Sequence, residues 1–457
     1  MGADFSDNAD GDESIGAGDV TGMSLRVAHF VQRYPPALGG SEAYFARLSR
    51  FLVSHGDQVT VLTTNAEALE SFWSPSAGTL SPGADLIDGV EVRRYAMSHR
   101  FRGRRWVLKP LSLVPHRAWQ CLTVPCNPFA WGMWRTTGDV FDVVHATAFP
   151  YAFPILCAQK LARRLRVPFF LTPFLHLGDP LQPRDPTRRV YTSPAMMSLA
   201  KNADCVFAQT TSEQAALVGC GVDPKRIVRQ GLGVEAKECT GGNRQQTRQA
   251  WGVSSEVVIG HLANNSEEKG TIDLLRATEK LHRQGLAFRV VLAGPEMPSF
   301  RRFWQGYGLA DTVIRLGPLS ASQKRDFFAS IDVFALPSRS DSFGLVLLEA
   351  WANGVPNVAY RAGGIADVVR DGQDGLLSPC GDITALSGDI RRLVMDAGLR
   401  QRLGMVGQQR VGREFRWADK LALVRDAYYT LAKPQTATSS RRGAIPWACG
   451  SGSGSPP

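Results

Sequence analysis

The sequence lacks any apolar run long enough to cross a membrane. A spanning helix needs roughly 18 or more consecutive apolar residues, and no stretch of the chain reaches that length. The first residues also lack the basic start and apolar run of a secretory signal. Both absences predict a soluble cytoplasmic protein, or one that binds the inner face of the membrane only peripherally.

Paired cysteines and dinucleotide fingerprints are missing as well. The eight cysteines are scattered, and the closest two, Cys121 and Cys126, do not have the C-x-x-C spacing of zinc or redox sites. We therefore expect reduced, buried thiols. No G-x-G-x-x-G follows a predicted strand, which disfavours a dinucleotide-dependent oxidoreductase.

Acidic residues are absent from one long stretch, although the whole chain carries a net charge of +10 with 42 acids. From residue 92 to residue 138 there is no Asp or Glu. Basic residues lie there among tryptophans and leucines: Arg93, Arg94, Arg100, Arg102, Arg104, Arg105, Lys109, Arg117 and Arg135. This pattern favours contact with an anionic membrane surface, with Arg100, Arg102, Arg104, Arg105 and Trp106 touching first. A basic, partly buried helical insertion is a nearly equal alternative. We expect no nucleic acid partner, although basic charge alone would permit one.

The alternation of strand and helix patterns predicts an α/β protein. Short apolar runs alternate with amphipathic stretches, as in parallel sheets that helices cover on both faces. A first series of strands is expected at 25–31, 58–64, 141–147, 167–173 and 204–210. A second series is expected at 256–262, 288–294, 312–318, 332–338 and 356–360.

The two series predict two doubly wound domains, for which 457 residues are ample. The glycine-rich stretch Gly231 to Asn243 has poor periodicity and marks the boundary. The expected parts are a disordered tail over 1–24, an N-terminal domain over 25–237, a C-terminal domain over 238–412, a last helix over 413–434 and a second tail over 435–457. In such sheets ligands bind at the carboxyl ends of the strands, so the active site is expected in the cleft between the domains.

Residues 332–377 carry the most chemical information. They contain a buried strand, a polar loop with Asp341, a helix with Glu349, a second strand and a Gly-Gly turn. A carboxylate accepts hydrogen bonds from vicinal hydroxyls, and the free N–H groups of residues 343–345 suit a phosphate or sugar oxygen. By spacing alone, a capping Asp341 and a solvated Glu349 are the simpler interpretation.

A lysine stands at the start of another predicted helix. Lys269 and Gly270 follow a polar loop and open the helix, where positive charge is unfavourable against the helix dipole. Lys269 is therefore a candidate anion ligand. A solvated loop lysine is the alternative.

Glycines and histidines follow several of the predicted strands. Gly39 and Gly40 lie between a strand and a helix, where glycine allows a ligand to approach the backbone, although most such pairs only form turns. His145 ends one strand, and His176 follows another. Both stand where strand ends meet the cleft. A packed structural histidine is the alternative at each position.

Together these elements resemble the retaining GT4 glycosyltransferases (glycosyl transferases group 1), which have the GT-B fold. Residues 332–377 are similar to the family's acid-x7-acid donor motif, with its FG-L-LEA core, G-x-P and GG turn. The resemblance covers about residues 25–432. It implies two Rossmann-like domains that face each other across a cleft, with a last helix that crosses back onto the N-terminal domain.

The resemblance also implies roles for individual residues. Glu349 would hold the nucleotide ribose, and Asp341, in place of the more usual Glu, would lie against the transferred sugar. Lys269 matches a diphosphate-binding lysine, but Asn264 stands where the family has an arginine, which leaves Arg339 as another source of positive charge. The implied catalytic residues are His176, His145, Asp341 and Lys269. The implied donor-binding residues are Gly39, Gly40, Asn264, Lys269, Gly270, Phe343, Gly344, Leu345 and Glu349.

Thr147 replaces the second histidine of the family's H-x-H, so His176 is the better candidate than His145 for contact with the transferred sugar. The expected reaction is hexosyl transfer, as in polysaccharide biosynthesis, from a UDP-, GDP- or ADP-sugar to a glycan, lipid-linked or small-molecule acceptor. Neither DxD nor a cluster of metal ligands occurs in the donor elements, so no metal or other cofactor is expected. The alternatives are a GT-B epimerase or phosphorylase and a catalytically idle subunit that binds nucleotide sugars.

Overall fold

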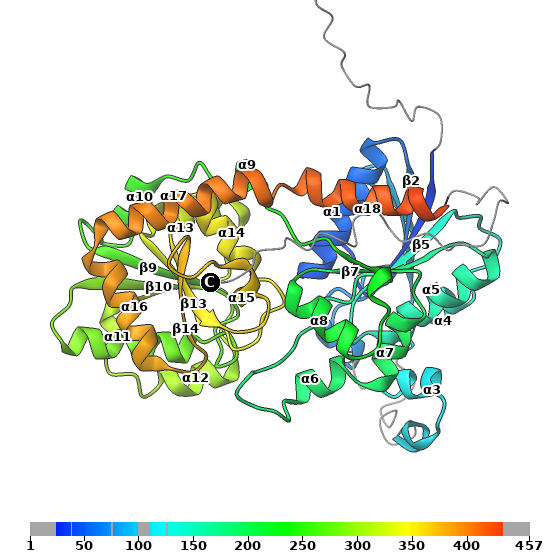
Figure 1. Cartoon of the computed structure of the whole chain (residues 1–457), viewed down its shortest axis with the longest axis horizontal. Helices are drawn as coiled ribbons and strands as arrows, with labels where there is room; N and C mark the ends of the chain where they lie inside the picture. Colours follow the sequence, from blue (N-terminus) through cyan, green and yellow to red (C-terminus); the bar gives the residue numbers. More distant parts are fainter. Residues whose placement is uncertain (1–23, 38, 75, 99–108, 125–126, 433–457) are drawn as a thin grey trace, which may run out of the picture.

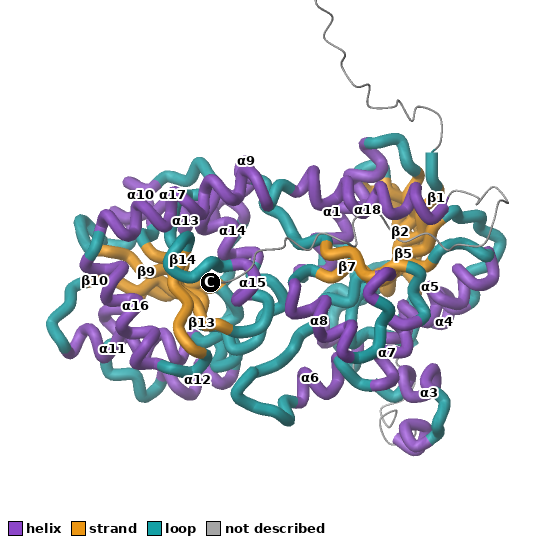
Figure 2. Tube along the Cα trace, viewed as in Figure 1, coloured by secondary structure: helices purple, strands orange, loops and turns teal. Residues whose placement is uncertain are grey.

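Two sheets, one in each half of the chain, organise the protein. The computed structural model describes residues 24–37, 39–74, 76–98, 109–124 and 127–432. The two halves lie side by side in Figure 1, and Figure 2 shows the strands inside each half with helices around them. The predicted α/β class with two doubly wound domains is confirmed. The two expected tails, 1–24 and 435–457, lie outside the described residues, except for Ser24.

The N-terminal sheet has the strand order β3-β4-β2-β1-β5-β6-β7-β8. Its strands are β1 (Arg26–Val31), β2 (Gln58–Thr64), β3 (Gly83–Ile87), β4 (Val90–Tyr95), β5 (Val143–Ala146), β6 (Phe169–Leu171), β7 (Cys205–Ala208) and β8 (Ile227–Arg229). All neighbours pair in parallel except β3, which pairs antiparallel with β4. The central strands are buried on both faces, which explains their continuous apolar runs.

The C-terminal sheet is fully parallel in the order β11-β10-β9-β12-β13-β14. Its strands are β9 (Val257–Leu262), β10 (Phe288–Ala293), β11 (Val313–Gly317), β12 (Val333–Leu336), β13 (Asn357–Arg361) and β14 (Gly375–Pro379). The sheet order reverses between β9 and β12. The loops that follow these two strands therefore lie at the switch point where doubly wound sheets bind ligands.

Helices connect the strands in both halves. Those of the N-terminal half are α1 (Gly40–Ser54), η1 (Leu69–Phe72), η2 (Lys109–Leu113), α3 (Arg117–Leu122), α4 (Trp131–Trp134), α5 (Ala152–Leu165), α6 (Pro186–Tyr191), α7 (Pro194–Lys201), α8 (Thr211–Gly219) and η3 (Pro224–Arg226). Those that follow are α9 (Ala236–Cys239), α10 (Arg244–Ala250), α11 (Thr271–Arg283), α12 (Pro298–Trp304), η4 (Ala310–Thr312), α13 (Ala321–Ser330), α14 (Leu345–Ala352), α15 (Ile365–Val368), α16 (Ile383–Met395), α17 (Ala397–Glu414) and α18 (Trp417–Ala432). No helix within the described residues is long and apolar enough to span a bilayer.

The acid-free stretch is only partly a surface feature. Arg93 and Arg94 belong to β4, which sequence analysis missed together with β3, β8 and β14. Arg93 pairs with Glu91 and Asp139, and the buried Arg94 pairs with Asp85. These two arginines are thus neutralised within the N-terminal domain and are unavailable to a membrane.

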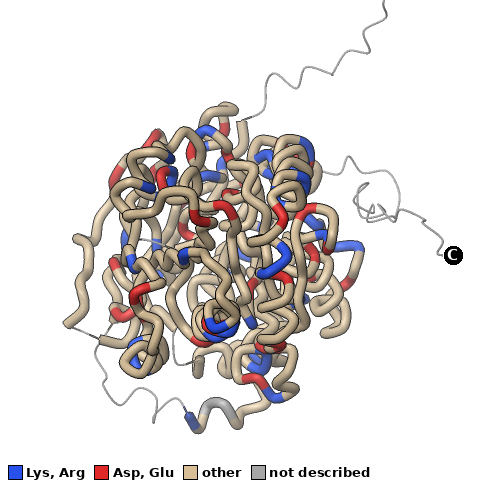
Figure 3. The backbone as a smooth tube through the Cα atoms, turned by 90° about the vertical axis from the view of Figure 1, so that its left-hand side faces the viewer, with Lys and Arg blue, Asp and Glu red and all other residues tan. Residues whose placement is uncertain are grey.

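The remainder of that stretch is more exposed. Leu113 is 84% exposed, and Trp119 and Trp131 are each 48% exposed. Residues 99–108, which contain Arg100, Arg102, Arg104, Arg105 and Trp106, lie outside the described residues. In Figure 1, α3 stands on the side of the N-terminal half away from α18. Figure 3 looks onto the end of the C-terminal half, where basic and acidic positions are interspersed.

The last helix packs on the N-terminal domain. α18 lies beside α1 in Figure 1, and Leu421, Val424, Ala427 and Tyr428 join the core formed with Val27 and Phe45. The Tyr428 hydroxyl contacts Nδ1 of His145 and, at 3.2 Å, Nε2 of His29. Burial lowers the pKa of His29 to about 3 and the pKa of His145 well below its usual range, so both rings are neutral at pH 7.

We predict that Tyr428→Phe destabilises the protein by about 1 to 3 kcal/mol, because two buried ring nitrogens lose a hydrogen-bonding partner. Chemical denaturation of the purified variant measures the change. Thr430→Ala, an exposed change on the same helix, is the control and should shift stability by about 0.5 kcal/mol or less. Equal stability of Tyr428→Phe and Thr430→Ala would show that the hydroxyl contributes nothing.

Candidate functional site

The loops after β9 and β12 meet through an ion pair. Nζ of Lys269 donates to Oδ2 of Asp341 at 3.0 Å and to the carbonyl of Ser340 at 3.2 Å. The second oxygen of Asp341, Oδ1, accepts from the N–H of Phe343 at 3.2 Å. The two residues that stood out in separate sequence motifs are thus in direct contact.

His176 shares the electrostatic environment of this pair. Burial lowers the pKa of Lys269, but the attraction of the Asp341 carboxylate outweighs this effect, so the pKa of the lysine is raised. Burial likewise opposes ionisation of Asp341, but Lys269 and then His176 lower the pKa of that carboxyl. Burial and the Lys269 charge lower the pKa of His176. At neutral pH a neutral imidazole therefore lies near an ionised Lys–Asp pair.

Close backbone contacts fix the position of these loops. Gly270 caps α11 at φ 73°, and a Cβ there would lie 1.7 Å from the carbonyl oxygen of Pro337. In the GG turn, a Cβ at Gly363 would lie 2.4 Å from the carbonyl oxygen of Asp341, and one at Gly364 would lie 2.0 Å from that of Ser342. Only glycine allows these loops to pack so closely.

The first turn of α14 follows the Asp341 loop. Gly344 is the N-cap residue at φ 82°, and the helix starts at Leu345, next to the buried Phe343. The opening N–H groups of a helix have no partner within it and carry partial positive charge. This end of α14 can therefore bind an anion close to Lys269.

Glu349, in the middle of α14, is held by a lysine from α13. Nζ of Lys324 donates to Oε1 of Glu349 at 2.6 Å, while Oε2 is buried and has no partner within the described part of the chain. Burial raises the pKa of Glu349, and Lys324 opposes the rise. The Glu349 carboxylate therefore keeps one oxygen free to accept a hydrogen bond.

A cavity of about 500 Å³ lies between the two domains. Lys269, Asn264, Arg339 and Ser340 line it from the C-terminal domain, and Asp179 lines it from the N-terminal domain. Asn264 is exposed at its rim. Arg339 is already paired, with Asp273 at 2.6 Å and Asp179 at 3.2 Å, so its charge is not free for a ligand.

The two glycines at the start of α1 differ. Gly39 is required by space, because a Cβ there would lie 2.2 Å from Oε2 of Glu42. Glu42 is buried and paired with Arg33 at 2.7 Å. Gly40 is exposed and would meet nothing within 4 Å, so its glycine is not explained by packing.

His145 is not brought together with the other candidates. Its side chain is fully buried under α18, where one ring nitrogen contacts Tyr428 and the other contacts the Thr172 hydroxyl at 2.8 Å. Both ring nitrogens are occupied. These contacts give His145 a structural explanation, and we assign it no role in transfer.

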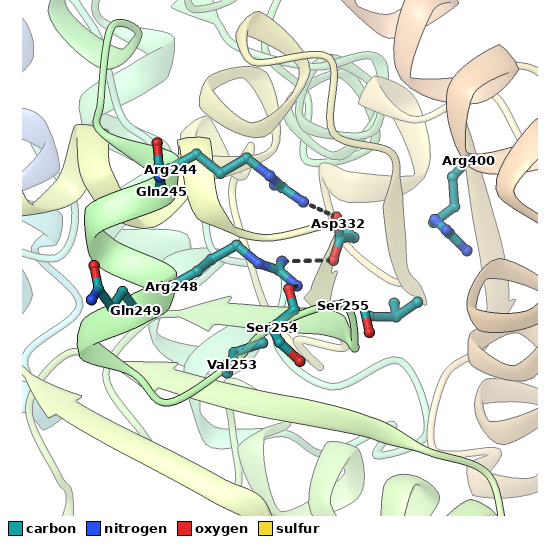
Figure 4. A pocket seen from close by; sticks show the side chains of 10 residues that line it. Arg244, Gln245, Arg248, Gln249, Val253, Ser254, Ser255, Asp332 and Arg400 are labelled. Carbon is teal, nitrogen blue, oxygen red and sulfur yellow. Dashed lines mark hydrogen bonds and ion pairs between the residues drawn. The ribbon is translucent and has the colours of Figure 1, made fainter.

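A larger cavity, of about 700 Å³, lies at the amino ends of the central strands β9 and β12, opposite the ends that face the cleft (Figure 4). Arg244 and Arg248 on α10 point toward Asp332, and Arg400 lies across from them. The two α10 arginines bind Asp332 and the carbonyls of Ala329, Ser330 and Ile331 at the end of α13. The two arginines thus cap the end of α13, which gives the charged residues of this cavity a structural role. No group of three or more His, Cys, Asp or Glu side chains is placed to hold a metal within the described residues.

Comparisons with known proteins give the family. Residues 39–233 match the family described as "Glycosyl transferase 4-like domain", and residues 243–410 match "Glycosyl transferases group 1". The chain is also 32% identical over 433 residues to a D-inositol 3-phosphate glycosyltransferase from Acidothermus cellulolyticus, with 88% of each chain covered. The chain belongs to the GT4 family of glycosyltransferases.

Solved structures agree with the GT-B architecture of this GT4 glycosyltransferase. Sucrose-phosphate synthase from Thermosynechococcus elongatus has a TM-score of 0.68 at 20% identity, covering 89% of this chain and 99% of that one. HepE from Anabaena, solved with UDP-glucose, has a TM-score of 0.64 at 18% identity, covering 89% and 100%. The predicted fold and family are confirmed.

Sequence analysis missed two residues of the site of the GT4 enzyme. Lys324 lies in the first turn of α13, where a lysine opposes the helix dipole, and this signal was available but not used. Asp179 gives no local signal, because its contact with Arg339 joins loops 160 residues apart. Such long-range pairs follow from the topology and not from any motif.

We predict that Gly270→Ala destabilises the transferase more than Gly285→Ala. Both glycines have positive φ, which costs alanine about 1 to 2 kcal/mol. Only Gly270 also faces a backbone carbonyl, which adds about 1 to 3 kcal/mol of overpacking, whereas the space around Gly285 is open. Denaturation of both variants measures the difference. Equal losses would mean that the β9–α11 loop yields without cost.

Proposed function

We propose that this GT4 transferase moves a sugar from a nucleoside diphosphate sugar to an acceptor hydroxyl with retention at the anomeric carbon. The observation that carries the proposal is the Lys269–Asp341 ion pair, which also interacts electrostatically with His176 and whose lysine lines the interdomain cavity. The bond between the anomeric carbon and the β-phosphate oxygen breaks, and its electron pair leaves on the diphosphate. The acceptor oxygen bonds to the same face of that carbon, and its proton passes to the departing diphosphate.

Each residue has a task in this proposal. Lys269 and the N–H groups of Gly344 and Leu345 at the start of α14 stabilise the charge that develops on the diphosphate, while the N–H of Phe343 holds Asp341. Asp341 and His176 contact the transferred sugar. The free oxygen of Glu349 accepts from a ribose hydroxyl. The nucleotide then departs without the help of a metal.

Gly39 and Gly40 complete the proposed site from the N-terminal domain, near the diphosphate and the acceptor. Asn264 offers the donor an amide in place of the charged arginine of other GT4 members, while Gly270 keeps Lys269 in position. Diphosphate binding in this enzyme therefore relies on Lys269 and on backbone N–H groups.

A screen of nucleotide sugars tests the proposal directly. UDP-, GDP- and ADP-sugars are compared by thermal shift, since a ligand at 100 times its Kd stabilises a protein by about 2.7 kcal/mol. The donor that binds is then offered to acceptors, including D-inositol 3-phosphate, for which several relatives are named, and lipid-linked or envelope glycans. NMR of the product shows whether the anomeric configuration is retained.

Two other functions are distinguished by the same experiment. A GT-B phosphorylase or epimerase would transfer the sugar to phosphate, or invert a sugar centre, with no acceptor glycan. An idle binding subunit would bind the donor and turn nothing over. The intact Lys269–Asp341 pair beside His176 favours the transferase.

We predict that Lys269→Ala lowers turnover by about a hundredfold, the usual effect of removing one preorganised charge stabiliser. Lys280→Ala, on the exposed side of α11, is the matched control and should keep the wild-type rate. Steady-state kinetics with the best donor measure both variants. A loss of less than about threefold for Lys269→Ala would move the diphosphate site elsewhere.

The same assay tests the metal-free mechanism. Excess EDTA is expected to leave the rate nearly unchanged. A strict requirement for Mg²⁺ or Mn²⁺ would contradict this part of the proposal.

We also propose that the N-terminal domain docks on the anionic inner face of the membrane, which suits a lipid-linked acceptor. Support comes from the exposed Leu113, Val114 and Trp119 next to the exposed Lys109 and Arg117. Tryptophans favour the membrane interface, and basic side chains attract anionic headgroups at about 1 kcal/mol each. Residues 95–138, which follow the paired Arg93 and Arg94, contain no Asp or Glu that would offset this charge.

Co-sedimentation with vesicles tests the docking surface. Wild type should bind vesicles of anionic lipid and release them as salt rises. Binding should fall sharply in a Leu113→Ser, Trp119→Ser double variant, and in a variant in which Arg100, Arg102, Arg104 and Arg105 become Ser. Leu86→Ser changes a side chain that is 77% exposed elsewhere on the same domain and serves as control. Equal recovery with neutral and anionic vesicles, or with neither, would exclude this surface.

A further inference from the structure

The loop of residues 177–185 belongs to the N-terminal domain but docks on the C-terminal domain. In Figure 1 the chain that leads into α6 extends toward the C-terminal half. Its Asp179 is 5% exposed and pairs with Arg339 across the interdomain cavity, with 3.2 Å between Oδ2 and Nη1. Leu181 lies against Gly381, where any Cβ would come within 2.8 Å of its Cδ1.

The 177–185 loop is built to hold Asp179 in this place. Oδ1 of Asp179 accepts from the N–H of Leu181 at 2.9 Å, and the N–H of Asp179 donates to Asp185 at 3.2 Å. Asp185 also caps α6. Gly178 has φ 70°, and a Cβ there would lie 2.2 Å from the Asp185 carboxylate. The loop is therefore a tight turn stabilised by its own carboxylates.

Arg339 is fixed just as firmly on the other side. Its Nε and Nη2 donate to Oδ2 of Asp273 at 3.1 Å and 2.6 Å. Asp273 is 2% exposed and also accepts from the Tyr360 hydroxyl at 3.2 Å. Of the two carboxylates that Arg339 binds, Asp273 therefore anchors it within its own domain, and Asp179 joins it to the other domain.

The position of this contact in the chain matters for the reaction. Asp179 follows His176 by three residues, and Arg339 precedes Asp341 by two. The ion pair thus joins the loop that carries His176 to the loop that carries Asp341. A shift of about 1 Å in the position of a group that contacts the substrate can cost a hundredfold in rate.

We infer that Asp179 is a positioning residue for glycosyl transfer: through Arg339 it holds the His176 loop of the N-terminal domain against the Asp341 loop of the donor domain. This inference rests on the proposed function of the two loops. The role of Asp179 in this inference is exerted through Arg339 and needs no contact with sugar or nucleotide. Its loss should therefore impair turnover, while the nucleotide still binds through Glu349, Lys269 and the start of α14 in the C-terminal domain.

Asp179 is the side of the pair to change. Arg339→Gln would leave the buried carboxylate of Asp273 without the positive charge that balances it and endanger folding. Asp179→Asn keeps the size of the side chain and the oxygen that accepts from the Leu181 N–H, but it removes the charge and the Oδ2 acceptor, which also binds Nε2 of Gln182 at 3.4 Å. Asp179→Glu keeps the charge. Arg184→Gln removes an exposed charge from the same loop and serves as the matched control.

In the kinetic arm, Asp179→Asn should lower kcat about tenfold or more. The affinity for free UDP, or for GDP or ADP if that base binds best, should stay within about twofold of wild type. Asp179→Glu should recover most of the rate, and Arg184→Gln should equal wild type. An unchanged kcat in Asp179→Asn, or a nucleotide affinity that falls together with kcat, would overturn the inference.

Small-angle X-ray scattering of the same proteins gives a readout that needs no activity. Asp179→Asn should have a larger radius of gyration than wild type and than Asp179→Glu, because the two domains lose their tie. Scattering curves that coincide would overturn the inference. If wild type transfers no sugar at all, the proposed function fails, while scattering still decides whether Asp179 ties the two domains.

Discussion

The Lys269–Asp341 ion pair is the contact on which the arrangement of the cleft depends. The two side chains come from loops after different strands, and each is largely removed from water, so either charge alone would be costly. They meet only because Gly270, Gly363 and Gly364 let the flanking backbones approach to distances that no Cβ would permit. This ion pair thus depends on the switch point of the parallel sheet, on the three glycines, and on the starts of α11 and α14, all of which lie close together.

Buried carboxylates in this domain are matched by cations from other elements. Glu349 on α14 is paired with Lys324 on α13, and Asp273 on α11 is paired with Arg339 from the loop after β12. These pairs keep the site ordered without a ligand, but they also commit most of its positive charge. Under the proposed function, an incoming diphosphate competes with Asp341 for Lys269. Donor binding is then an exchange of anions at the ammonium group of Lys269. The exposed amide of Asn264 is neutral and cannot supply that positive charge.

The sequence predicted the parts of the fold that local pattern controls. All ten expected strands are present, since buried parallel strands give continuous apolar runs. The β3–β4 pair was missed because its outer strand is exposed and lacks such a run. In the site, Lys269 and Asp341 carried local signals and do meet, whereas His145 had the same signal as His176 but lies under α18. A position at a strand end does not say whether a side chain faces the cleft or the core. His145 is covered by Tyr428 of α18, which lies 283 residues away in the sequence.

The return of α18 to the N-terminal domain has a consequence for how the chain folds as it is synthesised. Domains generally fold in the order in which they leave the ribosome. Here the core of the N-terminal domain is complete only when Leu421, Val424 and Tyr428 of α18 have been synthesised. The sheet and covering helices of the C-terminal domain, in contrast, come from the continuous segment 243–414. The second domain in the sequence is therefore the first to be complete. During synthesis, His29 and His145 stay uncovered until the last turns of α18 emerge.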